Sequence, residues 1–168
     1  MVKQATIKKE IFMTLKKGLP AFNVKNANIV ILGTFPGELS LCAKEYYSDS
    51  RNQFWQLLGI TATDYKAKTK LLEEKGIALW DVIASCERDG SADKNIKNMK
   101  YNDLSLLKGK TVLFNGKKAY NIFLTAKKQQ NIELNVTDKC VLPSSSAALA
   151  VTLKDKKRQW DKIINKYK

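Results

Sequence analysis

An uninterrupted apolar run, residues 29–32 (IVIL), ends abruptly at the turn sequence Gly33-Thr34-Phe35-Pro36-Gly37. Four apolar residues in a row are typical of a strand that is buried on both faces, as the strands of a parallel sheet are. The glycines and the proline allow a tight turn with exposed backbone amides. Since ligands of open α/β sheets bind at the carboxyl ends of the strands, this run predicts a buried strand that ends in a ligand-binding turn.

Three further apolar stretches predict strands, and helical patterns lie between them. The predicted strands are residues 29–33, 77–82, 111–114 and 140–142, and the predicted helices are residues 52–59 and 68–75 and two that begin near residues 117 and 152. Strands that alternate with helices predict a parallel sheet covered on both faces, which is a three-layer α/β/α fold. We expect one domain over residues 1–168, because the chain is too short for two.

Outside this alternation, the sequence predicts three local features. An apolar stripe over residues 5–19 predicts a packing helix that ends before Pro20. The polar stretch 85–100 is expected to be a connection near the edge of the sheet. Asn102 is expected to cap a short helix that carries Leu104 and Leu107.

The composition excludes several classes of site. No segment approaches the roughly 18 apolar residues of a membrane span, and lysines interrupt the N-terminal apolar residues, so we expect a cytoplasmic protein. The three cysteines are far apart, which argues against a disulfide framework and a zinc site. Because the chain has no histidine, a Ser-His-Asp triad and a histidine-ligated metal are excluded. We therefore expect neither a metal ion nor a cofactor.

The formal net charge of +14 has two explanations of similar weight. A polyanionic partner such as nucleic acid would gain affinity through the release of counterions. A lysine-rich solvated surface would carry the same charge without any such partner.

Four segments, in this order along the chain, resemble the uracil-DNA glycosylase superfamily and most closely its hypoxanthine (deoxyinosine) DNA glycosylase branch. They are Gly33-Thr34-Phe35-Pro36-Gly37 with Tyr46-Tyr47 and Ser50-Arg51-Asn52-Gln53-Phe54-Trp55; residues 79–88 (LWDVIASCER); residues 113–120 (LFNGKKAY); and residues 142–146 (LPSSS). The resemblance implies a three-layer α/β/α domain with a central four-stranded parallel sheet. It also implies a reaction in which the sugar gains positive charge and the departing base gains negative charge.

The resemblance assigns a role to each of five residues. Asn52 would position the hydrolytic water, Tyr47 would stack on a base flipped out of DNA, and Asn115 and the backbone amides of Thr34 and Phe35 would bind that base. Each side chain also has an ordinary structural explanation. Asn52 could cap a helix, Tyr47 could be a packing aromatic, and Asn115 could cap the helix that follows its strand.

Two features of the motifs concern the branch and the DNA contacts. Phe35 stands where many members of the superfamily carry the Asn or Asp that activates the water, and its presence favours the hypoxanthine branch and leaves that role to Asn52. The loop that contains the three serines would bind backbone phosphates. The predicted DNA contacts are Pro36, Gly37, Lys117, Lys118, Ser144, Ser145 and Ser146. A solvated face is the alternative explanation for the two lysines.

Two functions remain open from the sequence. The first is a monomeric DNA-repair glycosylase that removes hypoxanthine, and possibly uracil, from DNA without a metal or an obligate protein partner. The alternative is a non-catalytic domain of the same fold that binds nucleotides or nucleic acid. Asn52 together with Tyr47 distinguishes them, because a binding domain needs the stacking tyrosine but has no use for an amide that positions water.

Overall fold

The computed structural model describes residues 14–168 and contains the expected parallel sheet. Its four strands have the order β3-β2-β6-β7 and are all parallel. They are β2 (Ile29–Gly33), β3 (Ile77–Asp81), β6 (Thr111–Asn115) and β7 (Val141–Leu142). All five residues of β2 are buried, which agrees with a central strand covered on both faces.

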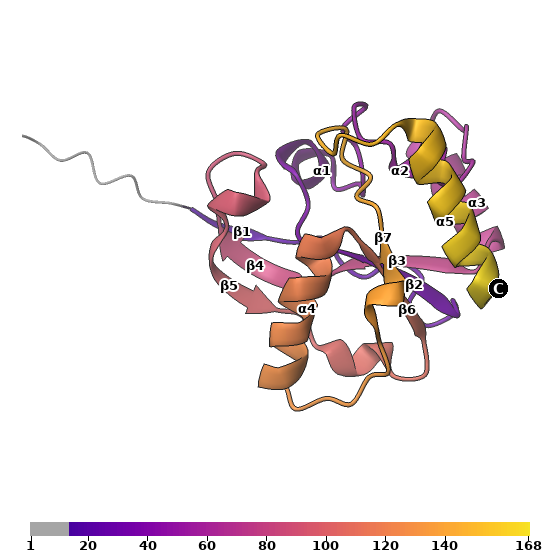
Figure 1. Ribbon diagram of the computed structural model, residues 1–168. Coiled ribbons are helices and arrows are strands. Elements are labelled where there is room, and N and C mark those ends of the chain that lie inside the picture. The colour runs from indigo at the N-terminus through magenta and orange to yellow at the C-terminus, as the bar shows by residue number, and fades with distance from the viewer. Residues whose placement is uncertain (1–13) are drawn as a thin grey trace, which may run out of the picture.

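Helices cover both faces of this sheet. They are α1 (Glu38–Ala43), α2 (Phe54–Leu57), α3 (Tyr65–Glu74), α4 (Lys117–Gln129) and α5 (Leu153–Tyr167). In Figure 1 the sheet lies between α4 on one side and α2, α3 and α5 on the other. The three-layer α/β/α prediction is therefore confirmed.

Local patterns explain why these helices begin and pack where they do. One stripe of α4, formed by Ala119, Ile122, Phe123 and Ala126, is apolar and buried. The hydroxyl of Thr152 accepts a hydrogen bond from the Asp155 amide and so caps α5. A buried Trp160 then fixes α5 on the core.

A second sheet was not expected. It has three antiparallel strands in the order β1-β4-β5, namely β1 (Leu15–Lys17), β4 (Ile83–Glu87) and β5 (Lys97–Tyr101). The helix predicted over residues 5–19 is thus wrong at residues 15–17, and its residues 5–13 lie outside the described part of the chain. Only Val82 separates β3 from β4, so the chain passes directly from the parallel sheet into this second sheet.

Three 3-10 turns complete the fold: Asp93–Asn95, Leu104–Leu107 and Asp138–Cys140. Asp103, and not Asn102, caps the second of them, because its carboxylate accepts a hydrogen bond from the Ser105 amide. The amide of Asn102 instead donates to the backbone carbonyl of Asp81 at 2.8 Å. The predicted cap was therefore one residue early, and Asn102 helps to hold the end of β3.

Candidate functional site

A cavity of about 560 Å³ lies at the carboxyl ends of the parallel strands. Its walls include residues from the ends of β2, β3 and β6 and from the loop after β7, as expected for a parallel sheet. The predicted site residues that line it are Thr34, Phe35, Pro36, Gly37, Tyr47, Asn52, Asn115, Ser144, Ser145 and Ser146. Lys117 and Lys118 are exposed at the start of α4 and do not line it.

The turn after β2 presents its backbone to the cavity. Among residues 14–168, the amides of Thr34 and Phe35 donate to no hydrogen-bond acceptor. The Phe35 ring is buried and lies 5.1 Å from the guanidinium carbon of Arg88. The two amides are therefore open to an anion or a carbonyl oxygen, whereas the Phe35 side chain is part of the packing beneath the turn.

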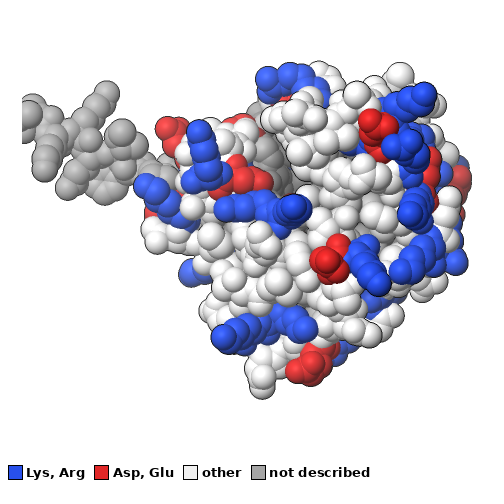
Figure 2. Space-filling model, in the orientation of Figure 1, with Lys and Arg blue, Asp and Glu red and all other residues white. Residues whose placement is uncertain are grey.

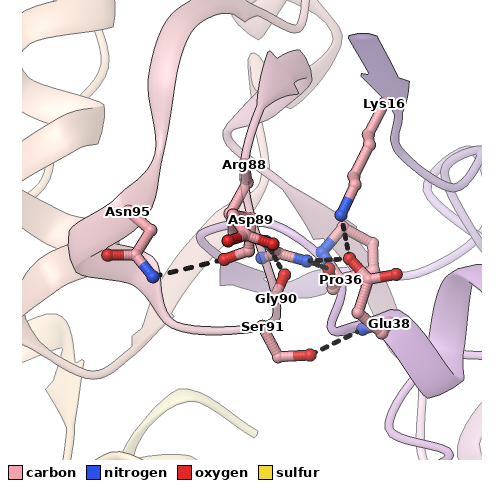
Figure 3. A network of polar contacts seen from close by, with 8 residues as sticks. All are labelled: Lys16, Pro36, Glu38, Arg88, Asp89, Gly90, Ser91 and Asn95. Atoms are coloured by element: carbon pink, nitrogen blue, oxygen red, sulfur yellow. Dashed lines mark hydrogen bonds and ion pairs between the residues drawn. The ribbon is translucent and has the colours of Figure 1, made fainter. Parts of the chain in front are cut away.

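Buried Arg88 braces this turn (Figure 3). Its Nη2 donates to the carbonyl of Pro36 at 2.6 Å, and its Nε donates to the carbonyl of Gly90 at 2.8 Å. The carboxylate of Glu38 lies 4.0 Å from the guanidinium and also pairs with Lys16. One charged side chain thus holds the turn after β2 against the loop that follows β4.

The same loop, residues 88–96, is tied down at two more points in Figure 3. The hydroxyl of Ser91 accepts a hydrogen bond from the Glu38 amide at 2.9 Å. The side-chain amide of Asn95 donates to the carbonyl of Asp89 at 3.2 Å. These contacts keep Ser91, Ala92 and Asp93 in the cavity wall.

Tyr47 is held in a defined orientation beside the cavity. Its φ of 53° lies in the left-handed region, which non-glycine residues seldom adopt, and such angles cluster at functional sites. The ring stacks on Phe54 with a centroid separation of 3.8 Å and an interplanar angle of 8°. Burial raises the pKa of the phenol, so Tyr47 remains neutral. One face of the ring is covered by Phe54, which leaves the other for a ligand.

The side-chain amide of Asn115 is fully engaged within the protein. Its Nδ2 donates to the phenol oxygen of Tyr47 at 3.0 Å and to the hydroxyl of Ser145 at 2.8 Å. Its Oδ1 accepts a hydrogen bond from the Ser145 amide at 2.8 Å. In this arrangement Asn115 joins Tyr47 to the loop after β7, and no amide hydrogen is left over for a ligand.

Asn52 both caps a helix and borders the cavity. Its Oδ1 accepts a hydrogen bond from the Phe54 amide at 3.0 Å, which satisfies one free donor of α2. Its Nδ2 has no hydrogen-bond partner among residues 14–168, and the half-buried side chain lines the cavity. The capping explanation and the functional explanation are therefore compatible.

Asp81 was given no role from the sequence, although it lies at the end of β3 and in the cavity wall. Its side chain is buried, and its Oδ2 has no hydrogen-bond partner among the described residues. Burial and the nearby Asp93 raise the carboxyl pKa from 3.8 to about 7, against the opposing charge of Arg88. A Cβ atom on Gly33 would lie 2.4 Å from its Oδ1, so any larger residue there would displace the carboxyl. The sequence could have pointed to Asp81, because it is an acidic residue at the carboxyl end of an apolar strand.

The cavity is acidic although the protein is basic. Its lining includes four carboxylates, Glu38, Asp49, Asp81 and Asp93, and one cation, Arg51. Arg51 is paired with Asp49 at 2.8 Å. Burial also raises the pKa of Asp93. Since Glu38 pairs with Lys16, and the raised pKa values favour the neutral forms of Asp81 and Asp93, the lining is only weakly negative, and its one cation is already paired and not free for a phosphate.

The loop after β7, residues 143–149, is called the serine loop below. The indole Nε1 of Trp160 donates to the carbonyl of Pro143 at 2.8 Å, and the Gln53 amide donates to the carbonyl of Ser145 at 2.9 Å. Ser145 is buried, whereas Ser144 and Ser146 are half-buried. The hydroxyls of Ser144 and Ser146 accept bonds from backbone amides, which leaves their hydrogens free to donate outward.

Within residues 14–168, no three His, Cys, Asp or Glu side chains are arranged to hold a metal ion. None of the helices there combines the length and apolar character that crossing a membrane requires.

Comparisons with known proteins agree on one family. The family model described as "Uracil DNA glycosylase superfamily" matches residues 19–168. A protein of Methanosarcina barkeri named hypoxanthine DNA glycosylase is 35% identical over 158 residues, which cover 86% of this chain and 95% of that protein. One of the same name from Methanosarcina acetivorans is 33% identical over 162 residues, which cover 89% of this chain and 98% of that protein.

A solved structure has the same fold. It is the solution NMR structure of a Methanosarcina acetivorans protein provisionally described as a uracil DNA glycosylase. The two chains are 31% identical and superpose with a TM-score of 0.69, over 92% of this chain and 99% of the other.

Proposed function

The chain belongs to the uracil DNA glycosylase superfamily, and on that premise we propose that it is a DNA-repair glycosylase acting on deaminated bases. It hydrolyses the N-glycosidic bond of a base flipped out of DNA, hypoxanthine first and uracil second. The observation that carries this function is the convergence of Tyr47, Asp81 and Asn52 on one cavity at the end of the parallel sheet. These three side chains supply a stacking face, a group that reads the base and an amide that holds water.

Asp81 distinguishes a deaminated base from its parent by its hydrogen-bonding groups. Hypoxanthine and uracil both present a lactam edge, a ring N–H next to a carbonyl oxygen, whereas adenine and cytosine present a ring nitrogen without a hydrogen. Because Oδ2 is sealed in the interior, only Oδ1 can meet the base, and as an acceptor it takes the lactam N–H, a hydrogen that the ring nitrogen of the parent base lacks. With a pKa of about 7, Asp81 is neutral in a large fraction of molecules near neutral pH. The uncharged acid therefore reads the lactam edge.

The walls of the cavity suit the charges that develop as the bond breaks. The departing base gains negative charge, which the amides of Thr34 and Phe35 receive. The sugar gains positive charge, which those carboxyl groups of the lining that are ionised stabilise. The free Nδ2 of Asn52 and its capping Oδ1 bracket a water that attacks the sugar. No histidine is needed in this scheme.

DNA approaches along the rim of the cavity. Ser144 and Ser146 donate hydroxyl hydrogens to backbone phosphates, and the Gly37 amide is a further donor, whereas Pro36, which has no N–H, contacts DNA through its ring. Lys117 and Lys118 contribute charge beside the rim. Figure 2 shows Lys and Arg side chains spread widely over one face of the protein, which supports an interaction with a polyanion. Ser145, which is buried on Asn115, shapes the loop from within.

The proposed enzyme acts in the cytoplasm as a monomer and needs neither a cofactor nor a metal ion. The experiment that tests it incubates the protein with oligonucleotides that carry one deoxyinosine, deoxyuridine or deoxyxanthosine in buffer with EDTA, followed by alkaline cleavage at abasic sites. We expect cleavage at deoxyinosine first. Absence of base release from all three substrates, with retained DNA binding, would favour the non-catalytic alternative.

A further inference from the structure

Lys156 of α5 is a fully buried lysine beneath the serine loop. Its ammonium donates to the backbone carbonyl of Ser146 at 2.7 Å and to the side-chain Oε1 of Gln53 at 2.8 Å. Gln53 directly follows Asn52, and its backbone amide donates to the Ser145 carbonyl. Lys156 therefore bridges the serine loop and the segment that carries Asn52, which lie far apart in the sequence.

The charge on Lys156 has no ionic partner in the part of the chain that the structure describes. No carboxylate of residues 14–168 lies within 4.0 Å of its Nζ. Burial lowers its pKa, because an ammonium loses hydration in the interior. Burial of an unpaired charge is unfavourable, whereas an apolar side chain of similar length would avoid that penalty but leave the Ser146 carbonyl and Gln53 Oε1 without their donor. The feature that points to function is the place of these two contacts, which join the serine loop to the residue next to Asn52.

We propose that Lys156 is a positioning residue of the glycosylase, holding the serine loop and Asn52 at a fixed separation so that DNA gripped by the loop meets the water held by Asn52. This inference rests on the proposed function. It assigns to α5, which does not line the cavity, a role in the reaction.

The hydrogen bonds of the serine loop explain how Lys156 acts. With Trp160 on Pro143 and Lys156 on Ser146, backbone carbonyls at the start and in the middle of the loop accept hydrogen bonds from α5. The negative ends of these carbonyl dipoles thus point toward α5 and away from the rim where phosphate is expected. Without Lys156, the Ser146 carbonyl could turn outward and repel phosphate, and Gln53 would lose the contact that fixes its side chain beside Asn52.

The test compares Lys156→Met, which keeps the length of the stem and removes the charge, with Lys156→Arg, which keeps a charged donor. Lys157→Met is the matched control, because Lys157 is the next residue of α5 and pairs with Asp161 at the surface. For each variant, we would measure the single-turnover rate of hypoxanthine release, the Kd for undamaged DNA and the melting temperature. We expect Lys156→Met to lower the single-turnover rate about 10- to 100-fold, as small misplacements of catalytic groups do.

The rates, Kd values and melting temperatures together can overturn the role proposed for Lys156. We expect Lys156→Met also to weaken binding of undamaged DNA, Lys156→Arg to recover part of both losses, and Lys157→Met to change neither. If Lys156→Met lowers only the melting temperature and keeps the wild-type rate and Kd, Lys156 is a structural residue and the proposal is wrong.

The test still decides if Lys156→Met does not fold or if the wild-type protein releases no base. If Lys156→Met does not fold, Gln53→Met removes one of the two bridging contacts at a half-buried site, and a smaller fall in rate is expected; an unchanged rate contradicts the proposal. If the wild-type protein releases no base at all, the proposed function fails by itself. The affinity of Lys156→Met for undamaged DNA then still reports whether Lys156 organises the serine loop, and an unchanged Kd counts against it.

Discussion

Two buried cations hold opposite walls of the cavity, and their surroundings differ. Arg88 braces the turn after β2 and lies near acidic groups: Glu38 is 4.0 Å away, and the guanidinium charge opposes the rise in the pKa of Asp81. Lys156 braces the serine loop and contacts only neutral oxygens of Gln53 and Ser146. The first wall is electrostatically compensated within the protein, whereas the second keeps an uncompensated positive charge.

We infer from this difference that the two walls of the cavity have different tasks. The Arg88 wall carries Asp81, to which we assign the reading of the base, and the charges of this wall affect whether that carboxyl is ionised. The Lys156 wall carries the serine hydroxyls for which we propose contacts with DNA, and its positive charge suits a phosphate that arrives from outside. Tyr47 and Asn115 connect the walls, because Asn115 bonds both the Tyr47 phenol and Ser145. Variants of the Arg88 wall should therefore mainly change stability and base reading, whereas variants of the Lys156 wall should also change DNA binding.

Among variants that compare the two walls, the largest effect on stability is expected from Arg88→Met. Loss of the guanidinium leaves the buried carbonyls of Pro36 and Gly90 without their donor, and we expect a loss of about 2–4 kcal/mol in the free energy of unfolding. Urea denaturation measures it, with the exposed Arg158→Met as control. A loss below about 0.5 kcal/mol, typical of surface substitutions, would show that Arg88 does not brace this wall.

Gly33→Ala should damage base reading more than folding. The added Cβ would lie 2.4 Å from the Asp81 Oδ1, so the carboxyl must move from its position in the cavity. We expect a single-turnover rate about 100-fold lower, because displacement of a reacting contact by about 1 Å has that effect. An unchanged rate for deoxyinosine, with the same melting temperature, would remove Asp81 from the base-reading role.

Asp81→Asn tests the protonation of the same wall. The folded pKa of about 7 lies above the ordinary value of 3.8, so the stability from the neutral form is complete below pH 4 and is lost as the pH rises through 7. Since Asn cannot ionise, the variant should gain stability over the wild type from pH 5 to pH 8, on the order of 1–3 kcal/mol. The activity of the wild type should fall above pH 7 and that of the variant should not. Parallel pH profiles for the two proteins would contradict a titrating Asp81.

The smallest effects are expected from substitutions of Tyr47, because its side chain lies between the two walls and is part of neither. Tyr47→Ala should weaken binding of lesion-containing DNA by ~1–3 kcal/mol, the usual contribution of a stacked base, and should leave undamaged DNA unaffected. Tyr47→Phe keeps the ring and loses one hydrogen bond from Asn115, so we expect a change of about 1 kcal/mol in stability. Equal weakening of damaged and undamaged DNA by Tyr47→Ala would place its ring outside the base pocket.

The sequence predicted the parallel sheet because its strands are short, apolar and buried on both faces. It did not predict the antiparallel sheet, because β5 (KNMKY) is largely exposed and carries little apolar pattern, and the residues of β1 fit a helical stripe equally well. The strands of this sheet are stabilised by pairing with one another and not by a periodicity of their own.

The site was predictable as a set of positions but not as a set of hydrogen bonds. Ten predicted residues line the cavity, because parallel strands bring their carboxyl ends together. The engagement of Asn115 depends on Tyr47 and Ser145, which are 68 and 30 residues away in the sequence. Lys156 was likewise hidden, because lysine at a helical position is usually solvated and only the packing of α5 shows that this one is buried.

The most direct test of the account is the single-turnover release of hypoxanthine by Asn52→Ala in buffer with EDTA. Asp64→Ala is the matched control, because Asp64 caps α3 as Asn52 caps α2 but lies outside the cavity. We predict a rate lower by roughly two to four orders of magnitude for Asn52→Ala with little change in Kd, and a wild-type rate for Asp64→Ala. A folded Asn52→Ala protein with the wild-type rate would show that Asn52 is only a helix cap, and would contradict the mechanism.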